Sequence, residues 1–528
     1  MFLNSVYLSG RSGISRLMFT SLIVLVLFIT AFGITAQENP PLRLGLEPPI
    51  NLDPATGVSD QEVLFSRLIY DYLIDLSADN ELIPQLAESW TISEDGLAYT
   101  FDLREGVTFH DGSEFTAADV VYTFNRIANP DVGSSAVNLL GEYEVTAVDD
   151  YTVAFTLPQP NADFLFGVAS RFALILPEGQ ETPNVLQEGS DAPYANFNGT
   201  GPYELAEYNI GENAVFTANE DYWAEGQPVL DTIEMIFIED KTAQINALRT
   251  GTVDAIFRIP IDQIPVLEGE ENITILQEQG STHPVVRLNA SEGGLGEDVR
   301  VRQAFKLATD RELLNLDVFD GLATVGNNDP IAPVYGQFFT PIADEYDPAR
   351  ACELLAEAGY VDANGEPRLE TTFHVDDTFN YAVLATAMAA QWEEGCIYAD
   401  LNVQSPNLYY SSDNPDNWLA VDLGLTAWGS RPTPQQFLTE AYVTGASFNE
   451  SRWSNAALDE LVTQASQTAD LEERAALYAE ISQIFAEEGP IIIPVFIPVF
   501  GAVNDRVEGL RMHPFSGRTD LRNVSLNS

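Results

Sequence analysis

Apolar and polar residues alternate along several stretches of the chain with the period of a strand. Residues 99–103 alternate strictly, which predicts a half-buried strand. A helix is expected to begin at Thr116, because Asp119 stands at capping-box spacing and an apolar face follows. Two more alternating runs flank the acidic pair 149–150 and predict a hairpin. We therefore expect residues 85–198 to form a compact α+β unit.

Strands and helices also follow one another in the rest of the chain. A strand is predicted at 233–237, a helix from Asp240 to Gly251 and a second strand at 253–259, which is the order of a parallel crossover unit. The helical period returns three times, over 298–314, over 347–360 and from Asp470 onward, where Glu473 stands at capping-box spacing. These mixed patterns predict an α/β protein.

The composition is that of a large, strongly acidic globular protein. The chain has 528 residues, of which 45% are hydrophobic and 10% aromatic, and a length near 150 residues per domain suggests about three domains. Its 80 acidic and 24 basic residues give a formal net charge of −56, and Lys241 and Lys306 are the only lysines. Such a charge repels phosphates, so nucleic acid and anionic membranes are poor candidates as partners.

The N-terminus has the pattern of an export signal. Arg11 and Arg16 precede a mainly apolar stretch, 17–34, and Ala36 marks a small residue before polar sequence. This order predicts a signal peptide over residues 1–36. The alternative is a single N-terminal membrane anchor, since about 18 apolar residues is close to the length of a span.

Two cysteines, Cys352 and Cys396, are too few for a disulfide scaffold. In an exported protein they can pair, and two buried thiols are the alternative. Only the distance between them in the fold decides between the two.

Motifs of catalysis and metal binding are missing from the sequence. The four histidines are scattered, with neither an HExxH pattern nor a pair at helical spacing, and there is no G-x-S-x-G elbow or P-loop. The many carboxylates are best explained as a solvated surface. We therefore expect no enzyme, no resident metal and no cofactor, and the plentiful aromatic residues favour a binding protein.

Six segments, in order, resemble one family, the extracytoplasmic solute-binding proteins of family 5, which serve peptide/nickel-type ABC importers. They cover nearly all of residues 40–510. The segments are LIPQLAESWTISEDGLAYTFDLREGVTFHDGSEFTAADVVYTFNRI, GTGPYEL with NEDYW, INALRTGTVDAIF, DVRVRQAFKLATDRE, YDPARACELLAEAGY, and ALDELVTQASQTADLEERAALYAEISQIFAEEGPIIIPVF.

The resemblance implies an α/β, two-lobed periplasmic-binding-protein (clamshell) fold with an extra α+β domain. The chain would cross between lobes near Gly280 and Val503, and closure would be a hinge motion. The implied domains are domain I over 37–84, 199–280 and 505–528, domain II over 85–198, and domain III over 281–504.

The implied function is capture of peptides or related small solutes between the lobes and delivery to the permease subunits of an ABC transporter. The protein would be a monomer, exported to the periplasm or to the extracytoplasmic face of the membrane. An exported enzyme or a signalling receptor on the same scaffold is the alternative. The ligand stays open among peptides, opine-like or anionic solutes and metal chelates.

The stretch LTAWGSRPTPQQFL, residues 425–438, bears on the ligand. Peptide binders of the family usually carry an Asp a few residues after a Trp like Trp428, where it pairs with the peptide ammonium group. This chain has Ser430 and Arg431 there. Arg431 can bind a carboxylate or phosphate with two parallel N–H bonds. We expect either an anionic group near Trp428 or peptide binding without the ammonium anchor; pairing of Arg431 with a surface carboxylate is the alternative.

Four further residues are candidates for ligand contact. Arg287 and Asn289 follow the first crossing between lobes, Tyr70 lies in a segment that resembles a helix end near the cleft, and Arg171 follows an apolar helical stretch. Packing or surface pairing is the competing interpretation for each of them.

Overall fold

The computed structural model describes residues 40–180, 196–342, 345–378 and 380–527. The predicted signal peptide, 1–36, lies outside these residues. Within the described ranges, no helix combines the length and apolar character needed to cross a membrane.

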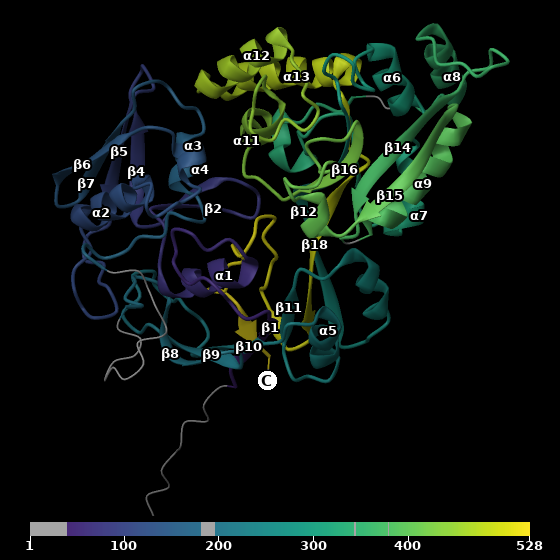
Figure 1. The fold of residues 1–528 in the computed structure, drawn as a ribbon. Helices are drawn as coiled ribbons and strands as arrows, with labels where there is room; N and C mark the ends of the chain where they lie inside the picture. Colours follow the sequence, from purple (N-terminus) through teal and green to yellow (C-terminus); the bar gives the residue numbers. More distant parts are fainter. Residues whose placement is uncertain (1–39, 181–195, 343–344, 379, 528) are drawn as a thin grey trace, which may run out of the picture. The chain divides into compact units, whose positions relative to one another are not determined.

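A 12-stranded sheet connects the early, middle and late parts of the chain (Figure 1). Its main path runs β15-β14-β16-β12-β18-β11-β1-β10-β9-β8, with β13 beside β18 and β17 beside β12. The strands are β1 (Leu42–Leu46), β8 (Tyr203–Asn209), β9 (Asn213–Ala218), β10 (Thr232–Phe237), β11 (Ala255–Phe257), β12 (Ile273–Leu288), β13 (Thr324–Val325), β14 (Leu369–Asp376), β15 (Ile397–Gln404), β16 (Leu423–Trp428), β17 (Ile491–Ile492) and β18 (Val495–Asn504).

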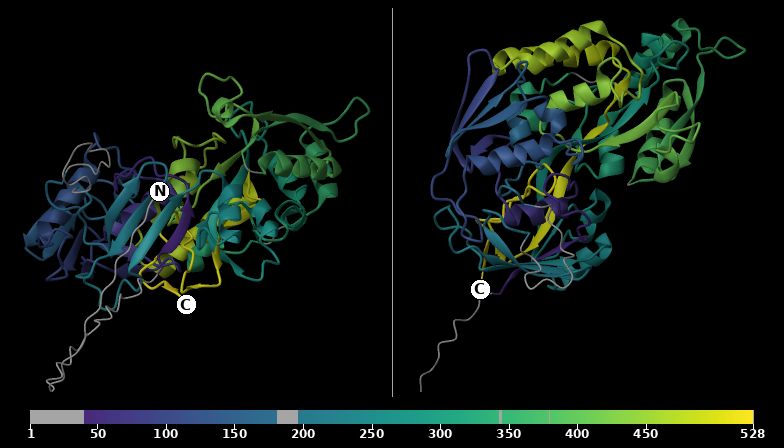
Figure 2. Two further views of the ribbon diagram at one scale, coloured as in Figure 1. Left: turned by 90° about the horizontal axis from the view of Figure 1, so that it is seen from below. Right: turned by 60° about the vertical axis from the view of Figure 1, so that its left-hand side comes forward.

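The long strand β12 links the two ends of this sheet. Its first part, from Ile273 to Glu278, pairs with β18, and its last part, from His283 to Leu288, pairs with β16. The register shifts between Glu278 and Thr282. Figure 2 shows from two further directions how the late strand β18, in yellow, joins the sheet beside earlier strands. One strand therefore passes from one set of partners to the other.

A separate four-stranded antiparallel sheet has the order β4-β5-β7-β6. The strands are β4 (Ala87–Ile92), β5 (Ala98–Leu103), β6 (Glu144–Asp149) and β7 (Thr152–Thr156). Helix α2 (Ala117–Ala128) packs on it, and the capping box of Thr116 and Asp119 is present. Phe101, Phe124 and Phe155 meet edge to face in its core. The predicted strand, helix and hairpin of this region are confirmed.

The remaining elements connect or cover these sheets. They are α1 (Asp60–Ile69), β2 (Ile74–Leu76), β3 (Leu82–Pro84), α3 (Val137–Leu140), α4 (Phe164–Val168), α5 (Lys241–Arg249), η1 (Ile261–Val266), α6 (Val299–Leu307), α7 (Arg311–Phe319), η2 (Pro333–Phe338), α8 (Pro348–Glu357), α9 (Tyr381–Glu394), α10 (Pro406–Tyr409), α11 (Pro434–Phe437), η3 (Leu438–Tyr442), α12 (Ala456–Gln467), α13 (Leu471–Glu488), β19 (Val507–Glu508) and β20 (Ser525–Leu526).

The single helix predicted over 298–314 is wrong, because the structure has two helices there, α6 and α7. Asp310 caps the second one, since its carboxylate accepts a hydrogen bond from the backbone N–H of Leu313 at 2.9 Å. An Asp in that role favours a new helix start over continuation of the old one.

Candidate functional site

Trp428 ends β16 and is buried. Its indole Nε1 donates to Glu450 Oε1 at 3.2 Å, and its ring packs edge to face against Phe437 and Phe448. Only 8% of the residue is exposed. The indole therefore belongs to the core beneath the loop and does not present a free flat face to a ligand.

The loop after Trp428 is fixed to strand β12. Ser430 Oγ accepts a hydrogen bond from the backbone N–H of Ser281 at 3.1 Å, and the Ser430 N–H donates to Thr282 Oγ1 at 3.1 Å. The Arg431 N–H donates to Ser281 Oγ at 3.0 Å. Gly280 lies directly beside this contact, because a Cβ there would be 3.2 Å from Ser430 Oγ. The loop therefore sits where β12 changes partners.

The Arg431 side chain is only partly satisfied by the protein. Its Nη2 lies 3.4 Å from Glu440 Oε2, and its Nη1 donates to the Gly429 carbonyl at 3.2 Å. Its Nε is buried and has no hydrogen-bond partner among the residues that the structure describes. The guanidinium carbon lies 5.7 Å from the ring centres of both Trp428 and Phe437. The alternative of a local carboxylate partner is thus realised, through one long contact that leaves donors unused.

Arg171 follows α4 and lies near Arg431. Its guanidinium stacks 4.8 Å from the centre of the Phe172 ring. Across the described ranges it is the one arginine whose side chain makes neither a hydrogen bond nor an ion pair. Burial, together with the positive charge of Arg431, lowers the pKa of Arg171 to about 10.

Two hydrogen bonds hold the Arg431 loop against earlier parts of the chain, and the first of them reaches the segment that carries Arg171. Thr433 Oγ1 donates to Asp163 Oδ2 at 2.6 Å, and Asp163 immediately precedes α4. Asn80 Nδ2 donates to the Pro432 carbonyl at 3.1 Å. The structure therefore brings two of the predicted residues together, although they are far apart in sequence.

Arg287 and Asn289 are buried and make polar contacts with neighbouring segments. Arg287 is 2% exposed, its Nε pairs with Glu450 Oε2 at 2.6 Å, and its Nη2 donates to the Trp418 carbonyl. Asn289 donates to Asp422 Oδ1 at 2.8 Å. For these two residues, packing and pairing account for the side chains.

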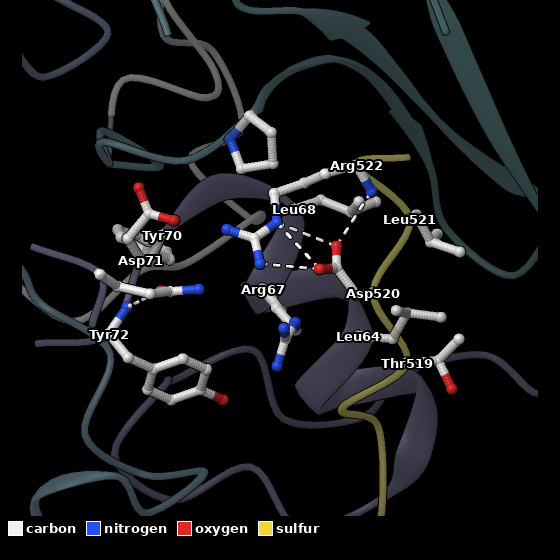
Figure 3. Close-up of a pocket in the computed structure, with 12 residues that line it drawn as sticks. Leu64, Arg67, Leu68, Tyr70, Asp71, Tyr72, Thr519, Asp520, Leu521 and Arg522 are labelled. Carbon is white, nitrogen blue, oxygen red and sulfur yellow. Dashed lines mark hydrogen bonds and ion pairs between the residues drawn. The ribbon is translucent and has the colours of Figure 1, made fainter. Parts of the chain in front are cut away.

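Tyr70 is buried beside a small cavity lined by both polar and apolar side chains (Figure 3). Its hydroxyl donates to the Asn196 carbonyl at 3.2 Å and accepts from Gln180 Nε2 at 3.1 Å. The cavity, of about 10 Å³, has room for about one water molecule and none for a solute. Tyr70 is therefore a structural residue in this conformation.

Asp71, next to Tyr70, is the centre of a donor cluster that sequence reasoning missed. Thr200 Oγ1, the Tyr222 hydroxyl and Trp223 Nε1 donate to its carboxylate at 3.1, 3.0 and 2.8 Å. Burial raises the pKa of Asp71 to about 6, against the lowering effects of Arg522 and of these donors. The three donors come from two of the motifs quoted above, GTGPYEL and NEDYW. The sequence therefore contained these residues, but it did not show that they converge on Asp71.

The largest cavity described, of about 1130 Å³, lies between segments 138–163 and 435–466. Amides, hydroxyls and apolar groups line it, and neither arginine nor lysine is among its lining residues. Its carboxylates are those of Glu142, Asp163, Glu440 and Asp459. None of the seven predicted residues lines it, and its walls come from segments more than 270 positions apart. Arg431 touches it only through Glu440.

No set of three histidine, cysteine, aspartate or glutamate side chains able to hold a metal ion occurs in the part of the chain that the structure describes. The structure thus brings two of the predicted arginines near each other, one of them on a loop that is fixed on a long strand.

Comparison with known proteins gives consistent matches over almost the whole chain. The family described as bacterial extracellular solute-binding proteins, family 5 Middle, matches residues 81–450. Heme-binding protein A of Haemophilus influenzae is 29% identical, with 91% of each chain covered, and the dipeptide-binding protein of Escherichia coli is 28% identical, with 91% of this chain and 92% of that protein covered. The structure of HbpA2 from Haemophilus parasuis is similar with a TM-score of 0.79 and 27% identity, covering 93% of this chain and 100% of that one.

Proposed function

We propose that this chain, which belongs to family 5 of the bacterial extracellular solute-binding proteins, is the extracytoplasmic binding component of an ABC importer. It captures peptides or related small solutes between two lobes and delivers them to permease subunits in the membrane. The observation that carries the proposal is the family match over residues 81–450, which is more than half of the chain. The predicted two-lobed α/β fold is confirmed by its structural neighbours.

The domain boundaries and the site belong to the same proposal. Domain I comprises 37–84, 199–280 and 505–528, domain II 85–198, and domain III 281–504, and the solute is held against the Arg431 loop. The position of that loop on β12, at the change of partners, supports this placement, because a solute there touches the strand that links the two ends of the sheet.

Relatives named for different solutes support a broad ligand class. One relative is a dipeptide-binding protein and another a glutathione-binding protein of Salmonella typhi. A similar structure is the oligopeptide-binding protein AppA of Bacillus subtilis, solved with a nonapeptide. In this chain the usual acidic anchor is replaced by Arg431, so peptides would bind without a carboxylate that holds their ammonium group.

We further propose that the protein acts as an exported monomer without catalytic activity. The family consists of solute-binding proteins, and the scattered histidines offer no nucleophile with a base. Its large negative charge fits a partner other than nucleic acid.

Native mass spectrometry of the purified protein with its co-purified solute tests the function directly. We expect a bound small molecule that is recovered chemically unchanged after prolonged incubation. A solute converted to product would instead support the exported enzyme. For the missing anchor, free and N-acetylated forms of one peptide are compared by isothermal titration calorimetry. We expect similar affinities, and strict loss of binding on acetylation would contradict the proposal.

A further inference from the structure

Arg171 has an unusual position in so acidic a protein. The chain carries 80 acidic residues against 24 basic ones, and other described arginines donate to carboxylates or to backbone carbonyls. Within the residues that the structure describes, the Arg171 guanidinium stacks on the face of Phe172 and its five N–H donors have no protein acceptor. A half-buried guanidinium with no acceptor loses hydration and gains no hydrogen bond in return.

The charged groups near Arg171 do not neutralise its positive charge. Among them, Arg431 carries the same sign, and Asp60 is the acidic one. Asp60 is already engaged, because its Oδ2 lies 2.5 Å from Arg258 Nε. Arg431 has its own carboxylate, Glu440, only at 3.4 Å, and keeps a buried Nε without a partner. Two neighbouring guanidinium groups are thus left with more donors than the protein supplies acceptors.

The two arginines come from segments that the fold holds in contact. Arg171 lies three residues after α4, whose preceding residue, Asp163, accepts from Thr433 at 2.6 Å. Thr433 is two residues after Arg431, whose backbone is fixed on β12 by Ser281. Both side chains are therefore presented by anchored backbone, which limits how far they can separate.

We propose that Arg171 and Arg431 together bind an anionic group of the transported solute, a carboxylate or a phosphate. The inference rests on the proposed function, since it names the chemical class of solute for that site. Each guanidinium can donate two parallel N–H bonds to such a group, and the anion offsets the repulsion between the two positive charges. A solute held in this way connects the segment after α4 to the loop after β16.

Matched pairs of probes test the proposal by isothermal titration calorimetry at low ionic strength. The anionic probes are the dipeptide Ala-Ala, glutathione and inorganic phosphate, and the neutral partner of the dipeptide is Ala-Ala amide. We expect at least one anionic probe to bind. If Ala-Ala binds, its affinity should be at least tenfold higher than that of Ala-Ala amide. Binding of phosphate alone would assign the site to phosphorylated solutes, and binding of the free acids alone to carboxylates.

Three variants locate the effect. Arg171→Gln and Arg431→Gln are expected to weaken the anionic probe at least tenfold each, whereas Arg171→Lys keeps the charge and loses less. Arg368→Gln is the matched control, because Arg368 is an exposed arginine paired with Glu370 at 2.7 Å. In the absence of solute, Arg171→Gln is expected to unfold at the same or a higher temperature, because it removes a repulsion. A side chain needed only for folding would give the opposite change.

Each remaining outcome overturns the proposal. No binding of any anionic probe, equal binding of the dipeptide and its amide, or unchanged binding in both glutamine variants rules out the anion site. If native mass spectrometry still finds a neutral solute on the wild type, on Arg171→Gln and on Arg431→Gln, only the proposed anion site is ruled out. If no solute is ever captured, the proposed function falls as well.

Discussion

Asp163 and Arg474 form a buried ion pair between segments 311 residues apart in sequence. Arg474 Nη2 donates to Asp163 Oδ1, and only 2% and 4% of the two side chains are exposed. The same Nη2 donates to the Tyr478 hydroxyl at 3.0 Å, and Thr433 donates to the other carboxylate oxygen. This pair therefore joins the start of α4 to helix α13, beside the loop of Arg431.

Removing the carboxylate should be costly. In Asp163→Ala, Arg474 keeps a buried charge without its partner, which typically costs about 3 kcal/mol or more. We expect the free energy of unfolding, measured by urea titration, to fall by about that amount. The double variant Asp163→Ala with Arg474→Met should recover most of the loss, because no unpaired charge remains.

An exposed pair provides the control. Asp79 and Arg511 form an ion pair on the surface, with Asp79 Oδ1 2.8 Å from Arg511 Nη2. Most of the Asp79 side chain is exposed. Asp79→Ala is expected to change stability little, since exposed pairs are screened by water and salt. If Asp163→Ala behaves like Asp79→Ala, the buried pair contributes far less than its burial indicates.

Asp71 should give the protein a pH dependence near pH 6. Its folded pKa, about 6, is above the value near 4 of an unfolded Asp, because burial disfavours the charged carboxylate. The folded state therefore binds the proton more tightly. The stabilising contribution is fully present below about pH 4 and is lost as the pH rises through about 6, for a total of about 3 kcal/mol.

Trp223 reports this titration, because its indole N–H donates to the Asp71 carboxylate at 2.8 Å. We expect the difference in fluorescence between the wild type and Trp223→Phe to change with a midpoint near pH 6. In Asp71→Asn the change should disappear. A midpoint near pH 4 would show that the three hydrogen-bond donors outweigh burial.

The disulfide between Cys352 and Cys396 resolves the alternative that the sequence left open. It joins α8 to the residue before β15 and closes a loop with a sequence separation of 44. Chain-entropy arguments give about 4 kcal/mol for such a loop. We expect no thiol to react in the native protein, and reductant to lower the thermal midpoint. Reductant should not affect Cys352→Ser with Cys396→Ser, and a reactive thiol in the untreated protein would contradict the bond.

Two glycines, Gly424 at the start of β16 and Gly429 just after its end, should differ sharply on substitution. A Cβ on Gly424 would lie 1.5 Å from Arg287 Nη1 and 2.6 Å from the Tyr409 hydroxyl oxygen. Gly424→Ala therefore has to displace Arg287 from its pair with Glu450, at a cost of about 3 kcal/mol. Gly429→Ala is the control, because its nearest neighbour would be 3.8 Å away. Equal urea midpoints for the two variants would show that Arg287 moves without loss.

Local patterns in the sequence determined much of the fold. The capping box at Thr116, the strand over 99–103 and the hairpin around 149–150 depend on residues a few positions apart, and all three are present. Ordered segments over most of the chain likewise identified the family. One helix was predicted over 298–314 because the apolar period continues across the break between α6 and α7. The hydrogen bond from the Leu313 N–H to the Asp310 carboxylate instead starts a new helix at that point.

Only the tertiary structure decided what the candidate side chains do. Trp428 and Arg287 share Glu450 as a buried partner, which removes both from a free surface. Arg171 lies near Arg431 because a contact between Asp163 and Thr433 joins their segments, which are about 260 residues apart in sequence. Sequence spacing fixes which residues share one face of a helix or strand, but it does not fix which carboxylate reaches which guanidinium. That pairing depends on long-range packing, and it separates the arginines that stabilise the core from Arg171, which has no acceptor among the described residues.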